Sequence, residues 1–365
     1  MNRTARGIVS LGAATCLSLG LVSPIATATA APSLAQPSAD RHRVEIPALD
    51  ALRNAVDPSP CATTLLDAYV DGLLADMTEE QLTFLLAHAD ALLSVPTYDA
   101  LFFGTAGDPD YGLDASARQL EHTFRDLKRF WTDVESDDIQ LLAMNGDVLL
   151  DADRIARTLT AMVETDQIAP MTPAEIALEA QTVADFMAAQ GDFYDNPLWT
   201  LNAYAFTGEG DPDPAFAALP DKIVMGEGIV EAYDAIGLGD VGSRVILAHE
   251  FAHHIQFELG TFDTGPSDEA EATRRTELMA DAMASYYAVH KKGLALNKKR
   301  VADALLSFAT VGDCQFASPG HHGTPLQRQR AADWGADLAA AARPQSTVLP
   351  ADVVIARFDA ALPAI

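Results

Sequence analysis

The stretch Val245-Ile246-Leu247-Ala248-His249-Glu250-Phe251-Ala252-His253-His254-Ile255 decides how the centre of this chain folds. Its polar residues are set among apolar ones in a pattern that predicts a buried helix. On such a helix His249 and His253 lie one turn apart on the same face, so their ring nitrogens can bind one metal ion. Glu250 is rotated by about 100° around the axis, so its carboxylate can reach a water molecule on that ion without binding the ion itself.

A second predicted helix, from Asp268 to Lys292, carries the expected third metal ligand. Ser267 is its expected N-cap and Gly293 its expected stop. Glu277 and Asp281 are four residues apart and therefore share one face of this helix. We expect Glu277 to bind the metal and Asp281 to accept a hydrogen bond from the outer ring nitrogen of a ligand histidine.

Two other acids, Glu269 and Glu271, are rivals for the third ligand position. Both fall in the first turn of the helix, where acidic side chains interact with the helix dipole, and neither has an aspartate one turn later. The metzincin pattern is excluded, because it requires Gly and His where this chain has Gln256 and Leu259. The third ligand must therefore come from outside the first helix.

His-Glu-x-x-His followed by Glu-x-x-x-Asp on the next helix resembles the gluzincins, the thermolysin-like clan of metallopeptidases. Within that clan the chain is most similar to the bacterial neutral zinc metallopeptidases, through its His-Glu-aromatic-small-His-His core, Val311-Gly312-Asp313 and His322-Gly323-Thr324-Pro325-Leu326-Gln327-Arg328. The resemblance covers roughly Leu198 to Leu338 and implies a zincin-like unit with Zn²⁺ as cofactor. One departure is Cys314, which stands where a second acidic residue is expected.

The resemblance also implies the chemistry of peptide-bond hydrolysis. Zinc would activate a water molecule, with Glu250 as the general base that later returns the proton to the leaving nitrogen. His322 is the candidate donor to the oxyanion, because a histidine downstream of the second helix has this role in thermolysin-like enzymes. The adjacent His321 could exchange roles with it, or both could be loop residues at the Pro319-Gly320 turn. His254 is expected to pack or hydrogen-bond structurally.

Upstream of the motif helix, Leu198–Phe206 and Lys222–Met225 have the composition of two strands, which predicts a hairpin beside the helix. Asn202, Ala203 and Tyr204 resemble the edge strand with which gluzincins hold an extended substrate peptide. The alternative is a buried strand without substrate contact.

The first residues of the chain have the three parts of a signal peptide. Arg3 and Arg6 precede an apolar region from Gly7 to Val22, and Ala28-Thr29-Ala30 is the expected cleavage site. We therefore expect a secreted or extracytoplasmic protein without stable membrane association after cleavage. An uncleaved anchor is the alternative, although the apolar region is short for a membrane span.

Cleavage would leave Cys61 and Cys314 as the remaining cysteines of the chain. In an exported protein, two cysteines predict one disulfide, here between the N-terminal region and the catalytic end. Two free, buried thiols are the alternative.

The formal net charge is −28 at pH 7, which argues against nucleic acids and anionic membrane surfaces as partners. Two acidic segments, Asp108–Asp114 and Glu209–Asp213, leave calcium binding open, although neither completes an EF-hand pattern.

These features predict a mostly helical α+β protein: signal peptide 1–30, linker or short pro-segment 31–60, helical N-terminal region 61–191, zincin-like metallopeptidase domain 192–345 and C-terminal helix or tail 346–365. Thr78 and Thr172 open capping boxes in the helical region. The expected function is an exported zinc-dependent peptidase that acts on peptides or proteins. The contrasting hypothesis is a non-catalytic binding or scaffold protein with a structural zinc site or a degenerate peptidase fold. Oligomeric state and cleavage specificity are not readable from the sequence.

Overall fold

The computed structural model describes residues 63–113, 118–312 and 320–365, together with a short strand at Val9–Ser10. Helices predominate and the sheet is small, which confirms the predicted α+β class. The strands are β1 (Val9–Ser10), β2 (Gln140–Met144), β3 (Ala203–Phe206) and β4 (Lys222–Gly226). The helices are α2 (Leu65–Ala75), α3 (Glu79–Phe103), α4 (Arg118–Phe130), α5 (Ala152–Glu164), α6 (Pro173–Ala189), α7 (Pro214–Ala217), α8 (Glu227–Ala235), α9 (Gly242–Glu258), α10 (Glu269–Val289), α11 (Lys298–Thr310), α12 (Pro325–Ala341) and α13 (Ala351–Ala361).

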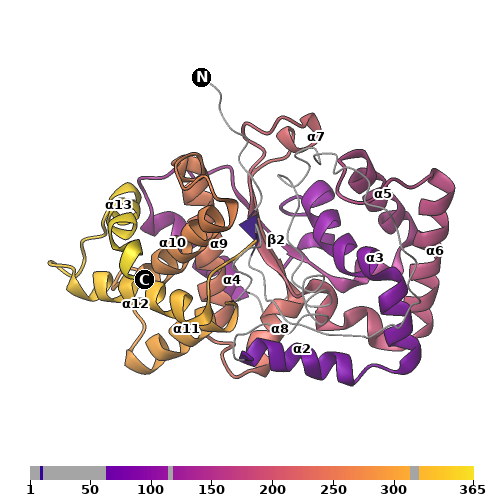
Figure 1. The fold of residues 1–365 in the computed structure, drawn as a ribbon, viewed down its shortest axis with the longest axis horizontal. Coiled ribbons are helices and arrows are strands. Elements are labelled where there is room, and N and C mark those ends of the chain that lie inside the picture. Colours follow the sequence, from indigo (N-terminus) through magenta and orange to yellow (C-terminus); the bar gives the residue numbers. More distant parts are fainter. Residues whose placement is uncertain (1–8, 11–62, 114–117, 313–319) are drawn as a thin grey trace, which may run out of the picture.

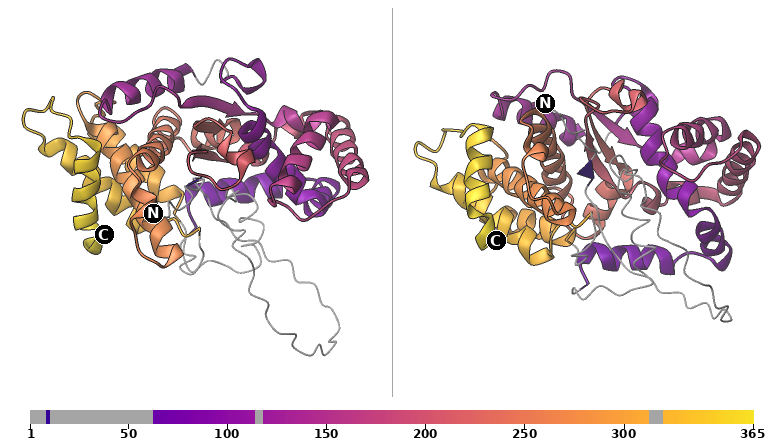
Figure 2. Two further views of the ribbon diagram at one scale, coloured as in Figure 1. Left: turned by 90° about the horizontal axis from the view of Figure 1, so that it is seen from above. Right: turned by 45° about the horizontal axis from the view of Figure 1, so that its top comes forward.

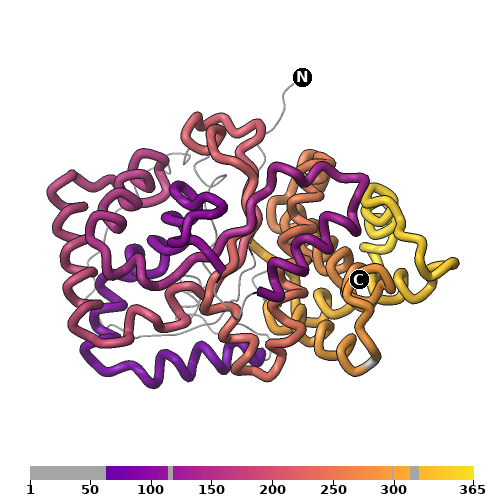
Figure 3. The backbone as a smooth tube through the Cα atoms, turned by 180° about the vertical axis from the view of Figure 1, so that it is seen from behind, coloured from indigo at the N-terminus to yellow at the C-terminus, as the bar shows by residue number. Residues whose placement is uncertain are grey.

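The sheet lies between two groups of helices (Figure 1). On one side α3 packs against α5, and α5 packs against α6. On the other side α10 packs against α9 and α12, with α11 and α13 beside them. Figure 2 shows these two groups at opposite ends of the molecule. Seen from behind in Figure 3, α4 lies over the second group, where it packs against α9.

The strands are ordered β1-β3-β4-β2 in the sheet. β3 and β4 form the predicted antiparallel pair, with Ala205 opposite Ile223. The expected first strand is shorter than predicted, because Pro197–Thr200 forms a 3₁₀ turn before it. β1, which falls in the predicted signal peptide, pairs antiparallel with the outer edge of β3. Without β1, β3 would be an edge strand of the sheet that the described residues form.

β2 was not predicted and lies in the segment expected to be helical. It pairs parallel with β4 over its whole length, from Gln140 opposite Lys222 to Met144 opposite Gly226. Its central residues are a short apolar run without alternation, which periodicity alone cannot assign to a strand or a helix. The sheet thus joins the two predicted regions 61–191 and 192–345, whose division into domains stays a prediction.

The predicted helix starts in the N-terminal region are confirmed. Thr78 caps α3 and Thr172 caps α6, each with a complete capping box, and Pro173 occupies the first turn of α6. α4 buries Leu120 and Leu127 on its inner face. Local side-chain chemistry is sufficient to set such boundaries, because a cap needs only residues three apart.

The helix that carries Glu277 differs at both ends from the prediction. Asp268, not Ser267, is the N-cap of α10, and its side chain accepts a hydrogen bond from the amide of Glu271. The helix ends at Val289 because His290 adopts an extended conformation, so the predicted end at Lys292 is wrong.

α10 and α12 cross closely. A Cβ atom at Gly335 of α12 would lie 2.0 Å from the carbonyl oxygen of Ala282 in α10, so only glycine fits there. Two turns before this contact, Arg328 of α12 reaches Asp281 near the centre of α10. Of the helices that the structure describes, none is long and apolar enough to cross a membrane.

Several predictions concern residues outside the described ranges. The signal peptide apart from β1, the linker 31–60, the disulfide between Cys61 and Cys314, and Asp313 all belong to them.

Candidate metal centre

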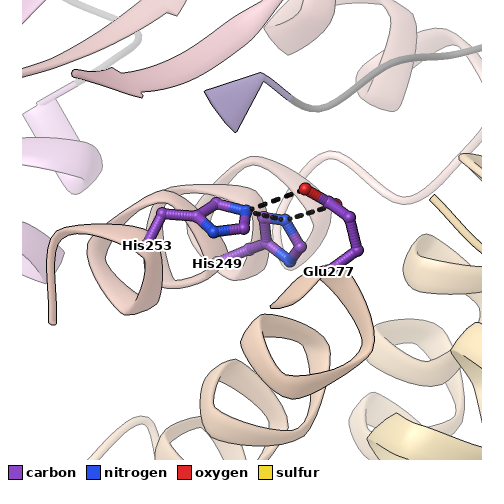
Figure 4. A group of neighbouring side chains, drawn as sticks. All are labelled: His249, His253 and Glu277. Carbon is purple, nitrogen blue, oxygen red and sulfur yellow. Dashed lines mark hydrogen bonds and ion pairs between the residues drawn. The ribbon is translucent and has the colours of Figure 1, made fainter. Parts of the chain in front are cut away.

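Three side chains from two helices meet in the interior: His249 and His253 from α9 and Glu277 from α10 (Figure 4). The Nε2 atoms of the two histidines are 2.9 Å apart. Nε2 of His249 lies 3.2 Å from Oε2 of Glu277, and Nε2 of His253 lies 3.2 Å from Oε1 of the same carboxylate. All three residues are fully buried. The structure therefore brings together the three residues that the sequence analysis selected as metal ligands.

Neighbouring acceptors determine which ring nitrogens carry hydrogen. Nδ1 of His253 lies 2.9 Å from the side-chain oxygen of Gln256, whose amide nitrogen donates to the carbonyl of Thr276. Nδ1 of His249 lies 2.9 Å from Oδ1 of Asp281. Amide and carboxylate oxygens only accept, so with a cation in the centre both Nδ1 atoms would carry hydrogen and both neutral rings would present a lone pair on Nε2 to the ion.

The spacing of these donors suits a small divalent cation. Two imidazole lone pairs and a carboxylate within 2.9–3.2 Å repel one another unless a cation or protons lie between them. A tetrahedral ion with bonds of roughly 2.0–2.1 Å separates its ligand atoms by roughly 3.3 Å. The donor set and its geometry therefore fit a metal ion held by three protein ligands.

The charges of the centre are strongly coupled. Burial lowers the pKa of His249, but the nearby carboxylates of Asp281 and Glu277 more than offset this and raise it to about 9. Burial raises the pKa of Glu277, whereas His253, His322 and His249 hold it well below its usual range. The pKa of His253 is lowered, chiefly by burial. A proton on His249 thus balances the carboxylates, and a divalent cation could replace it.

Arg328 of α12 holds Asp281 in place. Its Nε and Nη2 atoms donate to Oδ2 and Oδ1 of Asp281 at 2.8 and 2.6 Å, and Nη1 donates to the carbonyl of Val311. Nη2 also lies 3.6 Å from Oε2 of Glu277. Arg328, Asp281 and Glu277 are fully buried, so water does not stabilise the two carboxylates. The charge of Arg328 compensates them instead. Arg328 lies in the segment His322–Arg328 that resembles the gluzincins, but no local pattern predicts its role.

Glu250 follows His249 in α9, is close enough to His249 and Glu277 for their charges to shift its pKa, and is not one of the three ligands. It is fully buried, and among the described residues neither carboxylate oxygen has a hydrogen bond of normal geometry. Burial raises the pKa of Glu250 to about 8, while His249, Arg328 and the main-chain amide of Ala205 oppose the shift. A buried carboxyl group without a hydrogen bond of normal geometry costs stability, which marks it as a functional candidate.

The expected substrate-binding residues lie at the start of β3. Ala203 and Tyr204 are fully buried, and the hydroxyl of Tyr204 donates to the carbonyl of Thr97 in α3. The main-chain oxygen of Asn202 accepts a hydrogen bond from the amide of Gly226. The side chains of Ala203 and Tyr204 therefore belong to the core, and the main-chain groups on the outer edge of β3 are the candidates for holding a peptide. Their role in substrate binding stays a prediction.

His321 and His322 precede α12, and both are buried. His322 is close enough for its charge to lower the pKa of Glu277. Gly323 follows with a positive φ of 97°, which turns the chain into the helix capped by Thr324. The structure thus brings His322 towards the centre; its role as oxyanion donor, and that of His321, stay predictions.

The rival ligands do not join the centre. Glu269 and Glu271 are exposed in the first turn of α10, where Glu271 pairs with Arg274. Within the described ranges two groups of three possible metal ligands occur, and neither acidic segment considered for calcium is one of them.

Comparison of the chain with models of protein families, with curated proteins and with solved structures found no match.

Proposed function

We propose that the protein is an exported zinc-dependent peptidase of the gluzincin type, with a zincin-like unit built around α9 and α10. The observation that carries the proposal is the position of Glu250: a buried carboxylate without a hydrogen bond of normal geometry, next to three metal ligands that it does not join. A purely structural metal site has no use for such a group, whereas hydrolysis requires a base there.

Zinc fits the donor set, because two imidazoles and one carboxylate are the ligands of open catalytic zinc sites. A bound zinc ion would lower the pKa of a coordinated water molecule towards neutrality and polarise the substrate carbonyl. Glu250 would accept the proton of that water and return it to the leaving nitrogen. The positive charge of the ion would favour the deprotonated form of Glu250 and so oppose the effect of burial on its pKa.

The edge of β3 is the proposed site for the substrate peptide. β1 pairs antiparallel with this edge, with Val9 opposite Ala205 and Ser10 opposite Tyr204, so the edge accepts an extended segment. The main-chain amide of Ala205 in β3 is close enough to Glu250 to lower the pKa of its carboxyl group, so the edge strand lies beside the proposed base. Removal of the predicted signal peptide would leave this edge available to substrate.

A second candidate function is a binding or scaffold protein with a structural metal site. The observation that favours it is the complete burial of His249, His253, Glu277 and Glu250. Against it stands the number of ligands, because among the described residues the group contains three, whereas a structural zinc site usually has four.

The substitution Glu250→Gln separates these candidates. In the mature protein we expect it to keep the metal but to reduce hydrolysis of a peptide library by about 10²–10⁴-fold, because the base is lost. Metal content by mass spectrometry and peptide turnover are measured on the same samples. Glu269→Gln, the same change at an exposed position of α10, is the control and should leave both unchanged. Undiminished turnover in the Glu250 variant would refute the mechanism, and a wild-type protein without turnover would favour the scaffold.

A further inference from the structure

A second cluster of metal-binding side chains lies on another face of α9. It consists of Asp221, His254 and Glu258, whose ligand atoms all lie within 4.8 Å of one another. His254 and Glu258 are one helical turn apart near the end of α9, and Asp221 directly precedes β4. His254 follows the ligand His253 but points about 100° away from it around the helix axis.

The ring of His254 is held in one tautomer. Its Nε2 atom lies 2.9 Å from the carbonyl oxygen of Glu135, which can only accept a hydrogen bond, so the hydrogen of the neutral ring is on Nε2. Nδ1 then carries a lone pair. This atom is buried, has no hydrogen bond among the described residues, and lies 3.3 Å from Oδ2 of Asp221.

A lone pair that faces a carboxylate is unfavourable unless a positive charge lies between them. The surroundings add further negative charge. Burial raises the pKa of Glu258, and Asp221, Asp138 and Glu209 raise it further, while His254 acts in the opposite direction. Glu258 and Asp221 are partly exposed, so an ion from solvent can reach the cluster.

We propose that Asp221, His254 and Glu258 bind a second divalent transition-metal ion of the zinc class, separate from the metal centre that serves hydrolysis. One imidazole and two carboxylates suit such an ion, since imidazole is a ligand for zinc, whereas calcium takes 6–8 oxygen ligands in proteins. The proposal goes beyond the peptidase function and does not depend on it.

The role of this second ion is structural. It links the last turn of α9 to Asp221, the residue before β4, and β4 pairs directly with the edge strand β3. The ion therefore holds the helix that carries His249 and His253 against the sheet. The same helix would present one metal ion on each of two faces.

Zinc stoichiometry tests the proposal. Mature protein is stripped with a chelator, dialysed against buffered Zn²⁺ and analysed by mass spectrometry for metal per chain. Wild type should hold roughly two equivalents and the variants Asp221→Asn and Glu258→Gln about one each, because each variant loses one of three ligands. Both substitutions preserve side-chain volume at partly exposed positions. Circular dichroism and a cooperative thermal transition verify that the variants fold.

Two further variants identify the sites. Glu277→Gln removes a ligand of the first centre and should also leave about one equivalent, and its combination with Glu258→Gln should leave about none. Asp138→Asn, a nearby acid outside the cluster, is the matched control and should keep roughly two.

The proposal is overturned if wild type holds a single equivalent that only Glu277→Gln removes, which would mean that His254 and Asp221 form a plain ion pair. It is equally overturned if Asp221→Asn and Glu258→Gln both retain the wild-type content, or if the cluster takes up Ca²⁺ and not Zn²⁺. Loss of peptidase activity in Glu250→Gln has no bearing on this result, so the two proposals fail independently.

Discussion

Arg328 is the residue on which the charge balance of the metal centre depends most. Its guanidinium contacts the carboxylates of Asp281 and Glu277, and all three side chains are fully buried. A buried carboxylate without a partner is costly, because it is removed from water without compensation. The arginine therefore positions Asp281, which in turn lies against Nδ1 of His249.

We predict that Arg328→Met lowers the free energy of unfolding of the metal-free protein by about 3–5 kcal/mol, because Asp281 loses its partner. Urea unfolding at neutral pH measures the change. Arg330→Met, two residues away on the exposed side of α12, should change stability by less than about 0.5 kcal/mol. Equal losses in both variants would contradict the assigned role of Arg328.

Lys222, the first residue of β4, is buried and donates to the carbonyl oxygens of Leu101 and Gly104 at the end of α3. Burial lowers its pKa from 10.5 to about 8. Below about pH 8 the lysine is charged in both the folded and the unfolded protein. Between about pH 8 and 10.5 the folded protein holds fewer protons at this position than the unfolded one, so stability rises with pH there and levels off above.

We therefore predict that wild type gains stability relative to Lys222→Met between pH 8 and 9.5, by up to about 1.4 kcal/mol per pH unit. Other titrating groups are common to both proteins and cancel in the difference. Urea unfolding at several pH values measures it. A constant difference over this range would show that the lysine titrates normally.

At the level of elements, the crossing of α10 and α12 determines where Arg328 lies. Gly335 permits the close approach, because any Cβ atom there would collide with the backbone of α10 at Ala282. The crossing is needed for the site, since Arg328 and its partner Asp281 come from these two helices. Packing of main chain against main chain leaves no flexible side chain that could yield.

We predict that Gly335→Ala destabilises the protein by about 1–3 kcal/mol, despite the higher helix propensity of alanine. Gly72 in α2 is a matched control, because a Cβ atom there meets nothing within 4 Å. Gly72→Ala should be neutral or stabilising by up to about 1 kcal/mol. Thermal unfolding of the two variants compares them directly, and similar behaviour of both would show that the helices are not in tight contact.

At the scale of the whole molecule, the sheet is the part that connects the two groups of helices. β2 comes from the N-terminal region, β3 and β4 come from the region around the metal centre, and β1 comes from the predicted signal peptide. Export would remove β1 and leave β3 as an edge strand. Processing of the N-terminus would thus change access to the proposed substrate site.

We predict that the protein recovered from an exporting host begins at Ala31, because Ala28-Thr29-Ala30 forms the expected cleavage site. Intact-mass measurement of the exported protein tests this. A protein that retains residues 1–30 would refute cleavage at this site, and β1 would then stay on the edge of β3.

The features that could be predicted from the sequence are those that depend on neighbours a few residues apart. The spacing of His249 and His253 puts both rings on one helical face, and Glu277 and Asp281 are likewise one turn apart. The capping boxes at Thr78 and Thr172 follow from local hydrogen bonds. Each of these follows from helix geometry, which is the same in any protein.

Contacts between residues distant in the chain could not be predicted in this way and are seen only in the folded protein. Arg328 reaches Asp281 across 47 positions, and His254 reaches the carbonyl of Glu135 across 119. The pairing of β2 with β4 also joins segments that no local pattern links. Such contacts depend on how whole helices and strands pack, and the free energy of that packing is summed over the entire core rather than encoded at either residue.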